Sequence, residues 1–355
     1  MNSKTMFFAA GLLGSAAAVH AAGFQRADER ALASLTQGFG STQAQVLQRM
    51  GGTRDEAVAA LRPAVCPGHC TAAQREMDAQ RSRLQGNGWH LDVFGDGTLA
   101  EFADDRQHER AHAQGVDAAQ AMSQQALETA GRAYIARSLA SVITLGPGEA
   151  LVAEATYSRV DGGSDAAGHV DAPKTTANRI VFTRELDGVP VVGNGSKVIL
   201  TFLNDGSLES FRYDWPRYVA TGRTQAPLAA STLLQRVQRV VGARVGAVSA
   251  QSIDLASAAS GSPLDLGAGI ALQRFECGYY DAGLLSRDAS APVQAGCAYH
   301  ALHTIGGELP TTAGYSGAVP AAQKPMPDAR WPEVALLGNA NPANTNGDPG
   351  SATRD

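Results

Sequence analysis

The sequence predicts an α+β protein built from helix-backed antiparallel sheets, and two patterns lead to this fold class. The first is a series of apolar runs within residues 179–214, separated by Asp187-Gly188, Gly193-Asn194-Gly195 and Asn204-Asp205-Gly206. Asp-Gly and Asn-Gly steps between apolar runs are strong hairpin signals, so an antiparallel meander is expected here. The second pattern is the helical spacing of apolar residues in two other segments.

One predicted helix runs from about Asp117 to Leu139, and a second runs from Ser231 to Val241 with Gly242 as its stop signal. A helix followed by a strand meander forms an α+β module in which the helix covers one side of the sheet. Alternate residues of the meander should face that helix. The apolar stripe expected on the first helix is Ala119, Met122, Ala126, Ala130 and Tyr134, and the facing strand residues are Val198, Leu200 and Phe202.

The N-terminus has the features of a secretory signal peptide. A basic start at Lys4 precedes an apolar and small-residue run from Thr5 to Val19, and Val19-His20-Ala21 fits a small-residue cleavage site. The run is too short to span a bilayer, and no later stretch is long and apolar enough to do so. We therefore expect residues 1–21 to be removed and the protein to be exported, to a periplasm or to the cell exterior.

Composition restricts the function. The chain of 355 residues has a formal net charge of −5 and no basic block, which argues against nucleic-acid binding. A hydrophobic fraction of 44% is enough to build real cores, and the length suggests two or three domains. The sequence has no Gly-x-Ser-x-Gly nucleophile elbow and no Walker-type phosphate loop. No cofactor is expected.

Four cysteines, Cys66, Cys70, Cys277 and Cys297, indicate two disulfides in an exported chain. Three pairings can be written, and the local one, 66 with 70 and 277 with 297, is favoured because each pair encloses a short segment. Cys66-Pro67-Gly68-His69-Cys70 also resembles the Cys-x-x-Cys of disulfide oxidoreductases. Since three residues separate these cysteines, a structural staple is the preferred interpretation. Thiol-disulfide activity and a Cys/His metal site are the alternatives.

A short sequence match points to an internal repeat. Asp96-Gly97-Thr98-Leu99-Ala100-Glu101-Phe102 matches Asp205-Gly206-Ser207-Leu208-Glu209-Ser210-Phe211 at its Asp, Gly, Leu and Phe positions. Both segments can simply be Asp-Gly hairpins that converged because glycine tolerates positive φ. Alternatively, the chain duplicates an α+β unit, with a degenerate first copy near residues 30–104.

Composition shifts along the chain predict its organisation. Helices are expected up to about residue 85, followed by a hairpin around Gly95-Asp96-Gly97. Strands near 249–255, 270–280 and 296–303 should complete a third α+β unit. Pro, Gly, Asn and Asp accumulate beyond it, which is typical of a flexible tail. The expected segments are a signal peptide at 1–21, a helical region plus hairpin at 24–112, an α+β module at 116–220, a third α+β unit with a disulfide at 228–306, and a tail at 307–355.

One motif has the pattern of a catalytic metal site. His108-Glu109-Arg110-Ala111-His112 spells His-Glu-x-x-His, which on a helix places two imidazoles on one face to hold Zn²⁺, with the Glu as general base. The third ligand of the metzincin extension would fall on Ala118, while Asp117 comes one residue early and Glu128 is another conceivable ligand. Charged neighbours flank the motif, and Arg110 would lie buried beside the metal. A solvated helix face is therefore the preferred interpretation.

The meander within residues 116–220 carries a turn pattern made of Phe182, Gly188, Pro190, Gly193, Asp205 and Gly206. On these residues the segment resembles the PepSY and fungalysin/thermolysin-propeptide (FTP) superfamily. The resemblance implies a helix on an antiparallel sheet, repeated here in two or three PepSY/FTP-like or cystatin-like modules. In that superfamily the module is often an intramolecular chaperone or inhibitor in front of a secreted metallopeptidase. No His-Glu-x-x-His follows position 220, so the resemblance implies a freestanding module without catalytic residues.

Two function classes follow from these observations. The favoured one is an exported non-enzymatic binding protein, such as a protease inhibitor or a folding-assistance protein, that docks a protein partner through sheet edges or an exposed segment. That segment comprises Tyr213, Trp215, Arg217 and Tyr218, although Trp215 and Tyr218 could equally be core anchors. The alternative is a divergent zinc-dependent hydrolase that uses the His-Glu-x-x-His motif.

Overall fold

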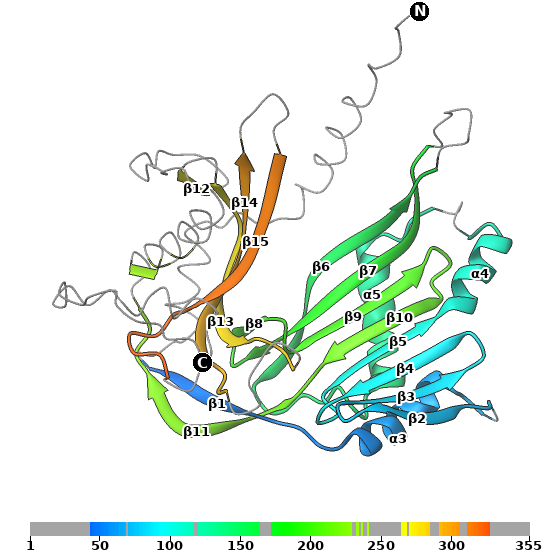
Figure 1. Cartoon of the computed structure of the whole chain (residues 1–355), viewed down its shortest axis with the longest axis horizontal. Coiled ribbons are helices and arrows are strands. Elements are labelled where there is room, and N and C mark those ends of the chain that lie inside the picture. The colour runs from blue at the N-terminus through cyan, green and yellow to red at the C-terminus, as the bar shows by residue number, and fades with distance from the viewer. Residues whose placement is uncertain are drawn as a thin grey trace, which may run out of the picture.

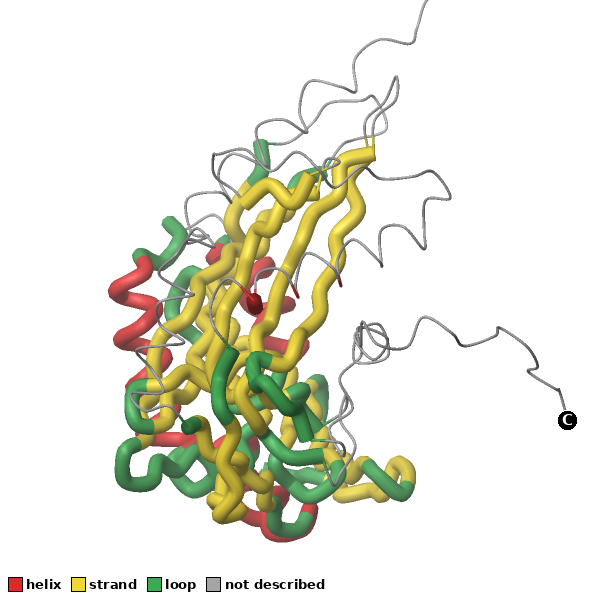
Figure 2. The backbone as a smooth tube through the Cα atoms, turned by 90° about the vertical axis from the view of Figure 1, so that its left-hand side faces the viewer, coloured by secondary structure: helices red, strands yellow, loops and turns green. Residues whose placement is uncertain are grey.

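The computed structural model describes residues 43–68, 70–116, 120–163, 172–228, 232–233, 236, 240, 264–267, 270–284, 291–305 and 311–326, so the predicted signal peptide lies outside it. Most of this part of the chain is strand (Figure 1; Figure 2). The helices are α3 (Arg54–Val65), α4 (Asp105–Ala113), α5 (Gln124–Tyr134) and the π-helical turn η2 (Ile135–Leu139). The strands are β1 (Ala44–Met50), β2 (Ala73–Asp78), β3 (Arg81–Gly86), β4 (Trp89–Phe94), β5 (Leu99–Asp104), β6 (Glu149–Asp161), β7 (Lys174–Leu186), β8 (Val189–Gly193), β9 (Lys197–Leu203), β10 (Leu208–Asp214), β11 (Arg217–Gln225), β12 (Leu264–Gly267), β13 (Ile270–Asp281), β14 (Gln294–Ile305) and β15 (Thr311–Pro320).

A single mixed sheet contains thirteen of these strands, in the order β15-β14-β13-β8-β7-β9-β10-β5-β4-β3-β2, with β6 paired to β7 and β12 paired to β13. β8 meets β13 in parallel, whereas the other neighbours are antiparallel. Because β8 pairs with each neighbour over two or three residues, it joins two wings that diverge in Figure 1. The first wing holds β2–β7, β9 and β10, and the second wing holds β12–β15. The fold is therefore mostly β with one continuous sheet, rather than two or three modules with separate sheets.

The region predicted to be helical up to residue 85 contains only one helix in its described part. Thr53 caps α3 and forms a capping box with Glu56, which fixes where the helix begins. Strands β1, β2 and β3 occupy positions where helix was predicted. All six residues of β2 are exposed, so no apolar alternation marks it in the sequence, and pairing with β3 makes it a strand. The hairpin predicted around Gly95-Asp96-Gly97 is confirmed by β4 and β5.

The helix predicted from residue 117 begins later, because Ser123 caps α5 at its N-terminus. The predicted sheet-facing stripe is confirmed in part, because Met122 and Ala130 are partly buried and pack against the core. Tyr134 is buried as expected, but Ala126 is exposed, and Ala119 lies outside the described residues. A Cβ at Gly131 would lie 2.7 Å from the ring of Phe182, so this glycine lets the helix approach the sheet closely. The buried helix residues are Leu127, Gly131 and Tyr134.

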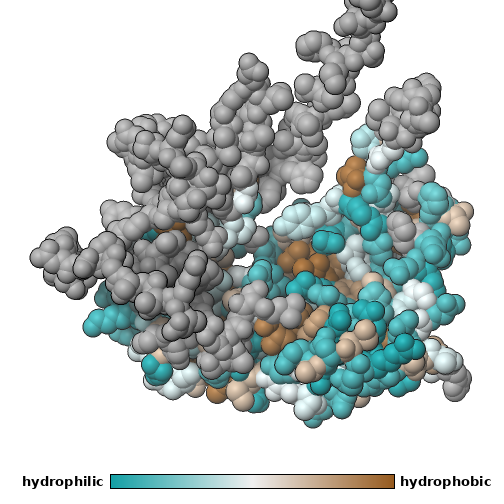
Figure 3. All heavy atoms as spheres, viewed as in Figure 1, coloured by the Kyte–Doolittle hydropathy of each residue, from teal (hydrophilic) through white to brown (hydrophobic). Residues whose placement is uncertain are grey.

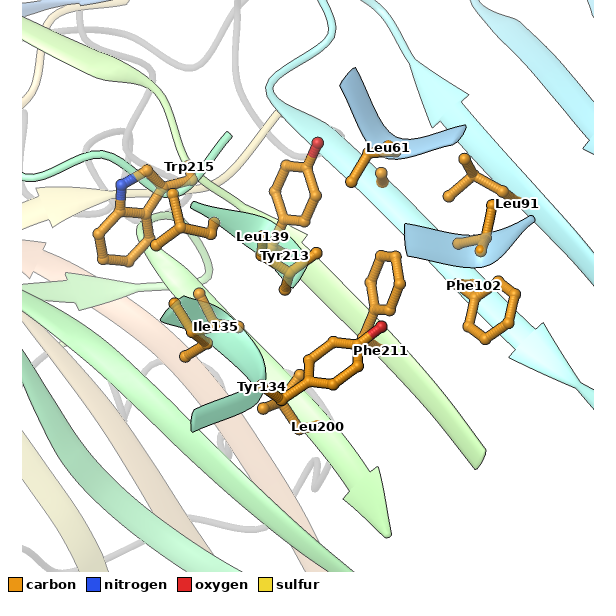
Figure 4. Packing of buried hydrophobic residues seen from close by; sticks show 14 of the residues in the cluster. Leu61, Leu91, Phe102, Tyr134, Ile135, Leu139, Leu200, Phe211, Tyr213 and Trp215 are labelled. Atoms are coloured by element: carbon orange, nitrogen blue, oxygen red, sulfur yellow. The ribbon is translucent and has the colours of Figure 1, made fainter. Parts of the chain in front are cut away.

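Helices α3 and α5 both contribute to one hydrophobic core on the first wing. Figure 4 shows Leu61 of α3 and Tyr134 of α5 packed with side chains from β4, β5, β9 and β10. The prediction that Val198, Leu200 and Phe202 face a helix is confirmed, because all three belong to this core.

The first wing consists of two units with the same order of elements. In the first unit α3 precedes β2, β3, β4 and β5; in the second, α5 precedes β6, β7, β9 and β10, with β8 as an additional hairpin strand. The last strands of the units, β5 and β10, pair at the centre, where Phe102 lies directly opposite Phe211. These two residues occupy matching positions of the repeated sequence segments, and their ring centroids are 5.2 Å apart. This arrangement favours the duplication alternative.

The second wing contains two of the predicted strands and two further ones, β12 and β15. Strands predicted near 270–280 and 296–303 are confirmed as β13 and β14, while the strand predicted near 249–255 lies outside the described residues. The described residues of the helix predicted at 231–241 are helical, and two of them, Leu233 and Val240, are buried in the core of this wing. The flexible tail predicted from residue 307 is wrong in its first part, where β15 pairs with β14 over its whole length.

Small residues explain why β15 escapes sequence analysis. Gly314 and Gly317 interrupt the strand, and glycine is depleted in strands in general. The strand is held because Ala318 and Val319 are fully buried beside β14. Residues 327–355 lie outside the described chain.

Strand β1 links the two wings. It pairs with β11 in a two-stranded ribbon, and Leu47 exchanges backbone hydrogen bonds of 2.8 Å with Val293, just before β14.

Within the described residues, no helix has the length and apolar character needed to cross a bilayer.

Candidate functional site at a buried charged junction

The His-Glu-x-x-His motif lies on α4, where Glu109 and His112 are exposed. Asp117 and Ala118, the positions where a third ligand would fall, lie outside the described residues. Glu128 lies on α5 and accepts a hydrogen bond from Arg132 of the same helix. Within the described chain, no three His, Cys, Asp or Glu side chains gather as a metal site would require.

Arg110, in the middle of the motif, has a structural contact that the sequence does not reveal. Its Nη2 donates to Asp205 at 2.9 Å and to Ser207 at 2.8 Å. The arginine therefore fastens α4 to the second Asp-Gly turn. This contact suits the interpretation of α4 as a solvated helix face.

The two local disulfides predicted from spacing, Cys66 with Cys70 and Cys277 with Cys297, are confirmed. Cys66 is the C-cap of α3 and is buried against the core of the first wing. The negative end of the helix dipole disfavours a thiolate at that position, whereas redox-active cysteines are activated at helix N-termini. The Cys66–Cys70 pair therefore suits a structural role better than thiol-disulfide exchange.

The segment predicted to be an exposed partner-binding surface is mostly buried. Tyr213 is 1% exposed and Trp215 is 5% exposed, so the expectation of exposure is wrong for both. The Trp215 backbone donates to the carbonyl of Thr98, and its indole Nε1 donates to the carbonyl of Thr144 at 2.9 Å. These contacts cover the segment with elements distant in sequence. Arg217 is exposed, and its contact with a partner stays a prediction.

Behind this segment, charged residues from distant parts of the chain form a buried junction. Arg49 of β1 donates to Asp281 at the end of β13 at 2.9 Å and to Thr98 at 2.6 Å, and it also pairs with Asp214 at the end of β10. Both arginine ion pairs are almost fully buried. The junction thus joins the ribbon, the first wing and the second wing.

Tyr218 of β11 and the turn after β8 complete the junction. The hydroxyl of Tyr218 donates to Asp281 at 2.6 Å and lies 2.7 Å from the hydroxyl of Ser196. Asp281 also accepts from the backbone N–H of Gly283 at 2.9 Å. A Cβ at Gly195 would overlap the carboxylate of Asp281, so the turn needs a glycine there to approach this residue.

The motif residues of the family resemblance lie around this junction and in the sheet. Gly193 has a φ of +101°, and a Cβ there would overlap the carbonyl of Asp281. Phe182 is buried in the core, while Gly188 forms the β7–β8 turn with a φ of +79°. Pro190 pairs with β7, and Asp205 and Gly206 form the β9–β10 turn.

Burial dominates the electrostatics of the junction. It raises the pKa of Asp214 in spite of the attraction of Arg49. Burial alone would lower the pKa of Arg49, but Asp281 and Asp214 outweigh it and the pKa is raised. Burial also raises the pKa of Tyr218 well above its ordinary value, and Asp281 adds to this effect. Burial, with a smaller contribution from the neighbouring Asp281, therefore makes the pKa of Asp214 higher than that of an exposed aspartate.

No sequence pattern marks Arg49 or Asp281, which hold the junction, and none assigns a role to Arg184, which borders it. Arg49 and Asp281 are single charged residues in strands, and their partners are far away in the chain. The one available signal was the glycine-rich turn at 193–195, whose close approach to another backbone is a common reason for glycine in a sheet.

No family model and no curated protein match the chain. Among solved structures, the chain is similar to an uncharacterized protein from Eubacterium rectale, with 11% sequence identity and a TM-score of 0.41. The match covers 80% of this chain and 85% of that one. It assigns neither a family nor a function.

Proposed function

We propose that this protein is an exported, non-enzymatic binding protein, built from two PepSY/FTP-like units, that pairs an edge of its sheet with an extended segment of a protein partner. An exported protease is the first class of partner to test, because modules of that superfamily often inhibit or assist secreted peptidases. The two disulfides are consistent with an oxidising compartment outside the cytosol.

The observation that carries this proposal is strand β6 at one edge of the first wing. β6 has 13 residues and pairs, within the described chain, with β7 alone. Residues 151–158 contain Glu154 as their only charged residue, and Tyr157 is exposed. A long edge of this kind offers backbone donors and acceptors to which an extended peptide can add as a further strand.

The opposite edge of this wing, β2, supports the choice of β6 by contrast. Three of the six residues of β2, Arg75, Glu76 and Asp78, are charged. Charged side chains are one device by which edge strands avoid pairing. The two edges therefore differ in their fitness for strand addition.

Proline scanning of β6 tests the proposal. Successive residues of a strand direct their N–H groups to opposite sides. Of Thr156→Pro and Tyr157→Pro, one therefore removes an outward N–H, and the other breaks the ladder with β7. Thermal unfolding identifies the variant that keeps wild-type stability.

That stable variant should lose a partner that the wild-type protein crosslinks in the native exported fraction, as identified by mass spectrometry. The matched control is whichever of Gln74→Pro and Arg75→Pro in β2 keeps wild-type stability, and it should retain the partner. Equal crosslinking by the β6 variant and the wild type would contradict docking at this edge. A wild-type protein that crosslinks to no partner would contradict the binding function itself.

A further inference from the structure

Arg184 of β7 borders the junction and is buried, with 1% of its side chain exposed. Its guanidinium carbon lies 3.9 Å from the ring centroid of Trp215 and 5.1 Å from that of Tyr218. Nη1 donates to the carbonyl of Pro216 at 2.8 Å and lies 3.5 Å from Oε1 of Glu149. Two aromatic rings and a backbone carbonyl therefore fix the orientation of this cation.

The other edge of the Arg184 guanidinium, formed by Nε and Nη2, has no hydrogen-bond acceptor among the described residues. Two other arginines of the chain use the same edge to bind a carboxylate. Arg83 donates from Nε and Nη2 to Asp92 at 2.6 and 2.5 Å, and Arg106 donates to Asp104 at 2.9 and 2.7 Å. This edge matches the two oxygens of a carboxylate in spacing and in charge.

Buried donors are paired in the great majority of cases. At Arg184 two adjacent donors of one guanidinium edge are unpaired among the described residues, which is the pair of atoms that a carboxylate would bind. We propose that Arg184, Trp215 and Tyr218 form a receptor for one carboxylate of a protein partner. This inference rests on the proposed binding function and gives it a chemical specificity.

Neighbouring negative charge favours a carboxylate over a phosphate. Glu149 lies 3.5 Å from Arg184, and Asp281 accepts a hydrogen bond from Tyr218, a member of the receptor. A group with two negative charges would be repelled by both carboxylates in a site of low dielectric constant. A singly charged carboxylate adds the least repulsion for a full bidentate contact.

Glu149 marks the route by which a partner can reach the receptor. Its side chain is 15% exposed, and its Oε2 accepts from the backbone N–H of Gly146 at 2.9 Å. Leu145, in the same connector, is an exposed large apolar residue. Nε and Nη2 of Arg184 are buried, so a partner's carboxylate would reach them only after Glu149 has moved away from Nη1.

Titration of the full-length protein with small probes tests the receptor without a known partner. The probes are acetate, its neutral match acetamide, an acetylated Gly-Asp-Gly amide, and the neutral Gly-Asn-Gly amide. Binding is followed by the shift in melting temperature and by tryptophan fluorescence, to which Trp215 contributes. Acetate and the Asp peptide should both bind, and the neutral probes should not.

The comparison of the two acidic probes distinguishes the source of the carboxylate. Tighter binding of the Asp peptide than of acetate supports a carboxylate supplied by a protein. Binding of acetate alone overturns the protein source and assigns the receptor to a free organic acid. Absence of any response in the folded wild-type protein overturns the receptor.

Arg184→Lys keeps the positive charge and removes the two-donor edge, so the Asp peptide should bind at least about tenfold more weakly. The matched control is Arg106→Lys, which should bind like the wild type because Asp104 already occupies that edge. Equal binding by Arg184→Lys and the wild type would also overturn the receptor. Loss of partner crosslinking with carboxylate binding intact would count against the proposed function alone.

Discussion

The two Asp-Gly turns of the first wing have the same local structure in different surroundings. Thr98 donates from its backbone and its hydroxyl to Asp96, at 3.1 and 2.7 Å. Ser207 donates in the same way to Asp205, at 3.0 and 2.6 Å. The glycine between them has a φ of +80° in the first turn and +82° in the second. Local sequence therefore specifies the turn completely.

The surroundings of the two turns differ in the arginine that contacts each hydroxyl. Arg49 donates to Thr98 from a side chain that is 0% exposed, and it also binds the buried Asp281. Arg110 donates to Ser207 from a side chain that is 35% exposed. The same turn is thus part of a buried junction in one unit and of the surface in the other, and burial sets how much stability depends on it.

The largest expected difference is in the loss of stability when Arg49 or Arg110 is replaced. Arg49→Met should destabilise the protein by about 3–5 kcal/mol, because it leaves Asp281 and Asp214 buried without their partner. Arg110→Met should cost less than about 1 kcal/mol, since it breaks an exposed ion pair. Urea unfolding of both variants at neutral pH measures the difference, and equal losses would contradict the contrast between the turns.

The next largest difference is expected between alanine variants of the two turn glycines, Gly97 and Gly206. Both have positive φ, so alanine at either position costs about 1–2 kcal/mol in backbone strain. At Gly97 a Cβ would also lie 2.5 Å from the carbonyl oxygen of Thr53, whereas at Gly206 it would meet nothing within 4 Å. Gly97→Ala should therefore lose about 1–3 kcal/mol more than Gly206→Ala in the same unfolding assay. A larger loss at Gly206 would show that the first turn can shift away from α3.

A smaller effect probes the symmetry of the units at their centre. Phe102 and Phe211 stack across β5 and β10, so a double-mutant cycle with leucine at both positions should give a coupling of about 0.5–1.5 kcal/mol. Phe102 paired with Phe275 is the control, because Phe275 belongs to the core of the second wing and the two effects should add. Additivity of the first pair would mean that the stacked rings contribute only by burial.

The smallest expected effect is an opposite pH dependence of stability at two aspartates, Asp205 beside Arg110 and Asp214 beside Arg49. Burial raises the pKa of Asp205, but hydrogen bonds from Ser207 and Arg110 outweigh it, and the net pKa falls below 3.8. The ionised Asp205 therefore contributes to the free energy of unfolding above pH 3.8, and this contribution is lost as the pH falls through the lower pKa of the folded state. Asp205→Asn should weaken the loss of stability in acid, measured as unfolding free energy against pH.

Asp214 should behave in the reverse sense. Burial raises its pKa above 3.8, so its contribution is fully present below 3.8 and is lost as the pH rises through the folded pKa. The free energy of unfolding should therefore decline as the pH rises from 3.8 through the raised pKa of Asp214, and Asp214→Asn should weaken this decline. Identical pH profiles for the two asparagine variants would contradict the assignment.

Part of the fold could be predicted from sequence because the signals are local. The hairpins, the meander of the second unit and the two short disulfides depend on residues close together in the chain. β2 and β15 could not be predicted, because their polar or small residues lack the apolar alternation of a half-buried strand. The exposure of Tyr213 and Trp215 was predicted wrongly, because distant elements cover them.

The turns, the cysteine pairs and the alternating face of the second unit follow from short stretches of sequence, since backbone preference and residue period act over a few positions. In contrast, Arg49 meets Asp214 and Asp281, which are 165 and 232 positions away, through the packing of distant strands. The same packing places Arg184 between aromatic rings with one edge unpaired. A charged residue in a strand carries no periodic signal of its partner, so such a junction becomes visible only once the chain is folded.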